Sequence, residues 1–163
     1  MRRSAIDVVT AICAAIFIAI LAVSAYFDAS IRVLHAVEAL PYLLAAILVV
    51  RRNKFGYALG FASGGFWLLM SAWRTSFIRN GFERLLSNDW SRPDLLIAVP
   101  AALSTGGLAL FALIGYARLR GKSARDAALF IAAFAGVAAF FAGIFAAFAP
   151  RYLALFRGIL PLP

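Results

Sequence analysis

The second apolar segment of the chain carries the residues best suited to chemistry. His35, Glu38 and Tyr42 recur at i, i+3 and i+7, which places their side chains on one face of a helix. A neutral imidazole bonded to a carboxyl group is a satisfied arrangement away from water. Ionisable groups inside a membrane span are functional candidates by default. The spacing therefore predicts a candidate polar or ion site. As a transport site it would use Glu38 as the proton carrier, with His35 setting the pKa of Glu38.

Two arginines complete this candidate site. Arg32 precedes the pair on the same segment, and Arg74 ends the next apolar run at a similar depth. An ion pair from either arginine to Glu38 would lock the helix in place, so a structural lock and a transport site are both open interpretations. Pro41 and Pro100 each remove a backbone N–H inside a predicted span. Two kinked helices could then surround a small outer vestibule.

Other chemistries lack their residues. The chain has one histidine and one cysteine, too few for a metal or haem site, so no metal is predicted. No G-x-S-x-G motif occurs and no serine is fixed near His35 by the sequence, so a catalytic triad is not predicted. We predict no enzyme and no cofactor. A lipid-modifying use of Glu38 with Arg74 and Arg79, or a bound lipophilic ligand, stays open.

The elements that must position this site are transmembrane helices. The 163 residues are 64% hydrophobic and 14% charged, whereas a soluble domain averages about 45–50% and about 25%. Long apolar runs without strand-like alternation exclude a β-barrel. The fold class is therefore all-α, one polytopic transmembrane bundle over residues 1–163. Its five spans, each near the roughly 20 residues that a bilayer needs, are predicted at 5–27, 33–50, 55–73, 95–117 and 127–149.

The segment 75–89 is too polar to cross a membrane. One side of its helical wheel is apolar and the other is charged, which is typical of a helix lying along a membrane surface. Trp73 and Trp90 bracket it, as interfacial tryptophans do. The sequence therefore predicts an amphipathic helix at the outer interface.

Basic residues gather in short segments between the apolar runs. The net charge is +9, and the clustered positions indicate cytoplasmic loops, not a nucleic-acid surface. The clusters are Arg2 and Arg3; Arg51, Arg52 and Lys54; and Arg118, Arg120, Lys122 and Arg125. They predict a bacterial-type inner membrane, with the N-terminus cytoplasmic and the C-terminus outside.

Two of the predicted spans have distinctive faces. Small residues spaced by four mark helix contacts in lipid, and the third span repeats glycine in this way. In the fifth span, small and aromatic side chains lie on opposite sides. The expected packing face is Gly56, Gly60, Gly64, Ala135, Ala139 and Gly143, and the expected lipid or lipophilic-ligand face is Phe130, Phe134, Phe141, Phe145 and Phe148.

These features favour a non-catalytic integral membrane protein. We expect it to act as a subunit or assembly factor of a larger membrane complex. Its partners would be membrane lipids and either other membrane subunits or further copies of itself. The alternative is a small proton-linked or solute channel or transporter that uses Glu38 and His35 as a homo-oligomer, because one small bundle has little room for a pore.

Overall fold

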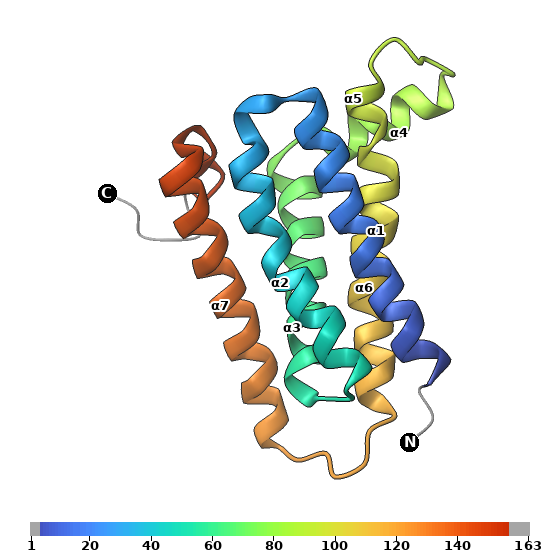
Figure 1. Ribbon diagram of the computed structural model, residues 1–163, viewed down its shortest axis with the longest axis vertical. Helices are drawn as coiled ribbons and strands as arrows, with labels where there is room; N and C mark the ends of the chain where they lie inside the picture. The colour runs from blue at the N-terminus through green and yellow to red at the C-terminus, as the bar shows by residue number, and fades with distance from the viewer. Residues whose placement is uncertain (1–3, 157–163) are drawn as a thin grey trace.

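The described residues, 4–156 of a computed structural model, form an all-helical chain (Figure 1). Five of its helical stretches are long and apolar enough to cross a membrane. The elements are α1 Ala5–Phe27, η1 Ala29–Ile31, α2 Arg32–Val50, α3 Lys54–Leu69, η2 Met70–Arg74, α4 Phe77–Leu86, α5 Pro93–Leu96, α6 Ala98–Ala117, α7 Arg125–Phe148 and η3 Pro150–Phe156.

Side-chain caps fix where two of the long helices begin. Ser4 forms a capping box, in which its Oγ accepts from the Ile6 N–H and the Asp7 carboxylate accepts from the Ser4 N–H at 3.2 Å. At the start of α3, Asn53 Oδ1 accepts from the Phe55 N–H at 2.8 Å. Arg52, with φ of 55°, makes the tight turn between α2 and α3. Local polar residues therefore set the register of α1 and α3.

Four helices form a ring and the fifth lies outside it. Helix α1 packs against α2 and α6, α3 packs against α2 and α6, and α7 packs against α3 and α2 (Figure 1). Glycines allow the close approach of α3: a Cβ on Gly64 would overlap the carbonyl oxygen of Thr105, and one on Gly60 would lie 3.3 Å from α6 side chains. A Cβ on Gly56 would lie 2.5 Å from Leu48 Cβ. The glycine face of α3 is thus covered within the chain.

The long helices differ from the predicted runs mainly at proline and at one wider turn. The predicted span 95–117 is divided at Ile97 into α5 and α6. Pro100 lies in the first turn of α6, so it does not kink a helix middle as expected. Pro41, by contrast, lies inside the continuous α2. The end of the predicted span 55–73 is the π-helix η2, and the predicted helix at 75–89 is the shorter α4.

The two faces of α7 lie the other way round from the expectation. Phe130, Phe134, Phe141 and Phe145 pack against the bundle, and the rings of Phe141 and Phe134 lie 5.2 and 5.9 Å from the ring of Phe66 on α3. Phe148 at the end of α7 is exposed, as expected. Ala135, Ala139 and Gly143 are exposed instead. The reason is that α3 offers its own aromatic rings toward α7, and aromatic pairs with bulky complementary shapes contribute more contact than alanines do.

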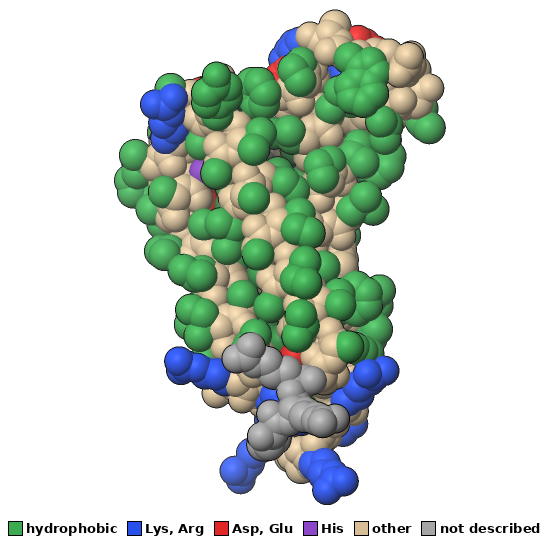
Figure 2. Space-filling model, turned by 45° about the vertical axis from the view of Figure 1, so that its right-hand side comes forward, with side chains coloured by type: hydrophobic (Ala, Val, Ile, Leu, Met, Phe, Trp, Pro, Cys, Tyr) green, Lys and Arg blue, Asp and Glu red, His purple; other side chains and the backbone are tan. Residues whose placement is uncertain are grey.

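Charged side chains gather at the two ends of the bundle, and hydrophobic side chains cover the middle (Figure 2). The basic end holds the start of α1 and the loops 51–53 and 118–124. The far end holds η1, the segment 75–97 that includes α4 and α5, and η3. An apolar belt between two charged ends is the surface that a bilayer requires.

Candidate functional site

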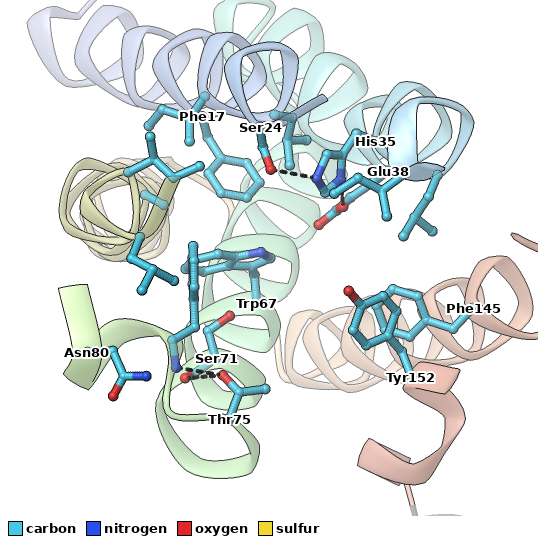
Figure 3. A pocket seen from close by; sticks show the side chains of 18 of the residues that line it. Phe17, Ser24, His35, Glu38, Trp67, Ser71, Thr75, Asn80, Phe145 and Tyr152 are labelled. Atoms are coloured by element: carbon cyan, nitrogen blue, oxygen red, sulfur yellow. Dashed lines mark hydrogen bonds and ion pairs between the residues drawn. The ribbon is translucent and has the colours of Figure 1, made fainter. Parts of the chain in front are cut away.

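A chain of polar side chains links α1 to α2 near the far end. His35 Nδ1 lies 2.8 Å from Glu38 Oε2, and His35 Nε2 lies 3.1 Å from Ser24 Oγ (Figure 3). His35 and Glu38 are one turn apart on α2, and the short turn 28–31 folds α2 back along α1, which brings Ser24 alongside. Glu38 is only 3% exposed. The structure therefore brings together His35 and Glu38, as the spacing predicts, and adds Ser24.

The order hydroxyl, imidazole and carboxylate is the order found in serine hydrolases. Those enzymes also use N–H donors beside the serine to stabilise the developing oxyanion. Ser24 lies in the last turn of α1, where backbone N–H groups are already bonded along the helix. These three side chains are therefore suited to hold the imidazole in one orientation against the Glu38 carboxyl group.

A cavity of about 420 Å³ opens beside this chain. It lies among α1, α2, the end of α3, the segment 75–97 and the end of α7. Five aromatic side chains contribute to its wall, namely Phe17, Trp67, Phe77, Phe145 and Tyr152. Its polar lining residues are Ser24, His35, Glu38, Ser71, Thr75, Ser76 and Asn80. A mostly apolar cavity of this size with a few converging polar groups is typical of a small-molecule site.

Two polar atoms in this wall are free to bind. Among the described residues, Glu38 Oε1 has no hydrogen-bond donor and the indole N–H of Trp67 has no acceptor. Neither atom is sealed in the protein interior, and in Figure 3 both side chains face the cavity. The cavity therefore offers one carboxylate oxygen as an acceptor and one N–H as a donor.

The floor of the cavity is shaped by the π-helix η2. The wider turn leaves the Ser71 carbonyl available, and Thr75 Oγ1 donates to it at 2.8 Å. Thr75 Oγ1 also accepts from the Phe77 N–H at 3.2 Å, which starts α4. Single π-turns occur frequently at functional sites. Here the turn ends α3 and directs the chain across the cavity.

The other residues of the predicted polar site have separate partners. Tyr42 donates to the Ser63 carbonyl on α3 at 3.1 Å, so its hydroxyl does not join Glu38. Arg32 Nε donates to the Ala25 carbonyl at 3.0 Å, so the expected Arg32–Glu38 lock is absent from the described contacts. Arg74 lies over the ring of Trp73. Glu38 is paired with His35 instead.

A buried acid at the basic end escaped the sequence analysis. Asp7 is 2% exposed, and its Oδ1 accepts from the hydroxyl of Tyr57 at 2.7 Å. Its Oδ2 lies 3.7 Å from Arg52 Nε. These contacts join α1 to α3 and to the loop before it. An acidic residue in the first turn of an apolar helix, close to basic loops, was the available signal.

A second acid joins three helices at the same end. Lys54 Nζ at the start of α3 lies 2.8 Å and 3.1 Å from the two carboxylate oxygens of Asp126 on α7. Tyr116 on α6 donates to Asp126 Oδ2 at 2.6 Å. Lys54 Nζ also donates to the Gly121 carbonyl at 2.6 Å. The loop 118–124 is therefore fastened to the start of α3.

Ser24 is the third residue that sequence reasoning missed. It is a lone hydroxyl in an apolar run, and only the pairing of α1 with α2 shows its role. No family model, curated protein or solved structure matches the chain. The site is therefore interpreted from its own geometry: a buried carboxyl, an oriented imidazole and an aromatic cavity.

Proposed function

We propose that this protein is an integral membrane subunit or assembly factor that binds another transmembrane helix through the outward side of α7. The observation that carries the proposal is the small-residue face of α7, which we define as Ala128, Ala132, Ala135, Gly136, Ala139, Gly143 and Ala146. All seven are exposed. In lipid, small residues let helix backbones approach closely.

The other outward surfaces of the bundle differ from this face. Large aliphatic side chains are frequent on them, as expected where a helix meets acyl chains, and α1 also exposes Ala15, Ala19 and Ala22. Examples of these large side chains are Val8, Ile12 and Ile16 on α1, Leu40, Leu43 and Ile47 on α2, and Leu103, Leu110 and Leu113 on α6. The small-residue face of α7 is longer than the alanine stripe of α1 and contains two glycines.

Packing within the chain does not require the two glycines on this face. A Cβ added to Gly136 or Gly143 would meet nothing within 4 Å. Glycine in a helix interior costs about 1 kcal/mol relative to alanine. By contrast, Gly64 on α3 is required by the Thr105 carbonyl. If a helix of a second membrane protein lay on α7, Gly136 and Gly143 would allow its close approach, as Gly64 allows the close approach of α6 to α3.

The distribution of charge supports an orientation in a bacterial-type inner membrane. The basic end, which carries the loops 51–53 and 118–124, would face the cytoplasm. The far end would face outward, with α4 lying along the interface. Exposed Trp73, Leu86 and Trp90 would anchor α4 and its flanks there. Arg2 and Arg3, which belong to the same basic set, lie outside the described residues.

Proton-linked or solute transport is the weaker alternative. A path through one chain would have to continue from Glu38 toward the basic end. Phe17, Tyr42 and Ala45 are fully buried below Glu38 and fill that direction. Transport would then require a homo-oligomer with a route between chains. The interaction role needs no such route and uses a surface that is already exposed.

A matched pair of leucine substitutions tests the proposal. Gly143→Leu places a bulky side chain on the small-residue face without a clash inside the chain. Ala19→Leu does the same on the exposed side of α1. Each variant is extracted from its native membrane in mild detergent, and its size and bound proteins are measured by gel filtration and mass spectrometry.

The proposal expects a large assembly for the wild type and for Ala19→Leu, and a smaller one for Gly143→Leu. Helix content by circular dichroism should be the same in all three. An unchanged assembly in Gly143→Leu would show that this face binds nothing. A wild-type protein that is a lone monomer would contradict the subunit role altogether.

A further inference from the structure

We propose that the far-end cavity binds a hydrophobic molecule that carries a protonated amine, with Glu38 as its counterion. The proposal goes beyond the subunit role, because it rests on the cavity and not on α7's outward face. The cavity of about 420 Å³ is open and lies at the end of the apolar belt. A molecule can therefore keep its apolar part in the aromatic wall while its charged group meets Glu38.

The first step of the argument concerns the free oxygen of Glu38. One oxygen, Oε2, is bound by His35, and the other, Oε1, has no donor among the described residues. The side chain is 4% exposed. A buried carboxylate is costly unless it is paired and hydrogen-bonded. An ammonium N–H donated to Oε1 would give the second carboxylate oxygen the partner that it lacks.

The aromatic wall favours a cation over a neutral guest. Trp67, Phe145 and Tyr152 surround the space into which Glu38 points (Figure 3). The faces of aromatic rings attract ammonium groups electrostatically. The carboxylate and the aromatic rings around this cavity together suit a hydrophobic amine. An anionic guest would meet the same carboxylate and be repelled.

The hydrogen-bond chain behind Glu38 keeps the carboxylate in position. Ser24 Oγ at 3.1 Å from His35 Nε2 fixes the imidazole, which holds Oε2. Glu38 can therefore rotate little, and Oε1 stays directed at the cavity. Preorganised charge of this kind improves binding because less freedom is lost when the guest arrives.

The test compares two probes of the same shape. N,N-dimethylbenzylamine is protonated at neutral pH, and isobutylbenzene has the same heavy-atom skeleton without the charge. Both are titrated by calorimetry into full-length protein in phosphatidylglycerol nanodiscs. Glu38→Gln keeps the shape of the side chain and removes its charge. Glu83→Gln, an exposed carboxylate on α4, is the matched control.

The proposal expects the amine to bind wild type and Glu83→Gln alike, and Glu38→Gln at least about tenfold more weakly. Isobutylbenzene should bind wild type and Glu38→Gln equally and more weakly than the amine binds wild type. Equal amine affinity in wild type and Glu38→Gln would overturn the proposal. So would isobutylbenzene binding as tightly as the amine, because the cavity would then select only for apolar shape.

A second variant separates loss of the site from loss of the fold. Trp67→Leu removes one ring face and leaves Glu38 in place, and it should weaken binding of the amine by a larger factor than binding of isobutylbenzene. Helix content and melting temperature verify that each variant is folded. Adding phosphatidylethanolamine to the nanodiscs distinguishes two sources of the natural amine. If this lipid competes with the amine probe, the cavity binds a lipid headgroup. If it does not compete, the cavity binds a free amine. Neither result rescues the proposal if Glu38→Gln binds normally.

Discussion

The two ends of the bundle use buried acids in different ways. At the basic end, both oxygens of Asp7 and both oxygens of Asp126 have donors or cations beside them. At the far end, Glu38 has one partnered oxygen and one that faces a cavity. All three acids are buried, so burial alone does not distinguish them. An acid whose two carboxylate oxygens both have partners holds helices together, whereas an acid with one free oxygen can bind a ligand.

The basic end is also the more cross-linked of the two. Asp7 joins α1 to Tyr57 on α3, and Asp126 joins α7 to Lys54 on α3 and Tyr116 on α6. At the far end, the chain from Ser24 to Glu38 joins only α1 and α2, which the turn 28–31 already holds together. Loss of a polar contact should therefore cost more stability at the basic end.

The largest effect is expected for Asp7→Ala. The change removes the acceptor of the Tyr57 hydroxyl and the ion-pair partner of Arg52. Breaking a buried pair in this way costs about 3 kcal/mol of unfolding free energy. Denaturant unfolding in detergent measures it, with Glu83→Ala on the exposed face of α4 as the control. A loss below about 1 kcal/mol would break the comparison between the ends.

A smaller effect is expected when the Lys54–Asp126 pair is removed. Lys54→Met and Asp126→Asn should each lower the melting temperature, by less than Asp7→Ala does, because this pair lies closer to solvent. The double variant should lose less than the two single losses added together, since both remove the same contact. Fully additive losses would show that the two side chains do not act as a pair.

Ser24→Ala should change stability by about 1 kcal/mol or less. It removes one hydrogen bond to His35 Nε2 and leaves His35 bonded to Glu38. The same variant should weaken amine binding severalfold, because the imidazole is no longer fixed. Thermal unfolding and the calorimetric titration are run on one preparation. A large drop in melting temperature with unchanged amine binding would mean that the Ser24–His35–Glu38 hydrogen bonds hold helices together, as the contacts of Asp7 and Asp126 do at the basic end.

The smallest effect is expected for Asp89→Asn in the exposed loop after α4. Hydrogen bonds from Ser91 hold the pKa of Asp89 below its ordinary value. The stabilisation this gives is present above the ordinary aspartate pKa and is lost as pH falls through the lowered one. Wild type and variant should therefore differ slightly in melting temperature at pH 7 and converge in acid. A difference that grows in acid would contradict this sign.

Local patterns in the sequence predicted the helices well. Apolar runs of about 20 residues place five long helices within a few positions of their observed ends. Pro100 moved one boundary, because a proline without an N–H fits the first turn of a helix better than its middle. The pairing of His35 with Glu38 was also local, since residues three apart on one helix meet without help from the rest of the fold.

Contacts between helices were the part that the sequence left open. The wheel of α7 separates phenylalanines from small residues but does not tell which side meets α3, and that choice depends on Phe61 and Phe66 on the partner helix. Ser24 and Asp7 acquire their roles only through His35 and Tyr57 on other helices. Periodicity describes one helix, whereas a site of this kind requires several.

The most direct test compares two isosteric changes, Asp7→Asn and Glu38→Gln, in stability and in amine binding. Each replaces a buried carboxyl with an amide, one at each end of the bundle. We expect Asp7→Asn to lower the melting temperature clearly and to bind the amine like wild type. Glu38→Gln should melt close to wild type and lose the amine. If Glu38→Gln lost as much stability as Asp7→Asn and kept the amine, Glu38 would be a structural anchor and the difference between the ends would not exist.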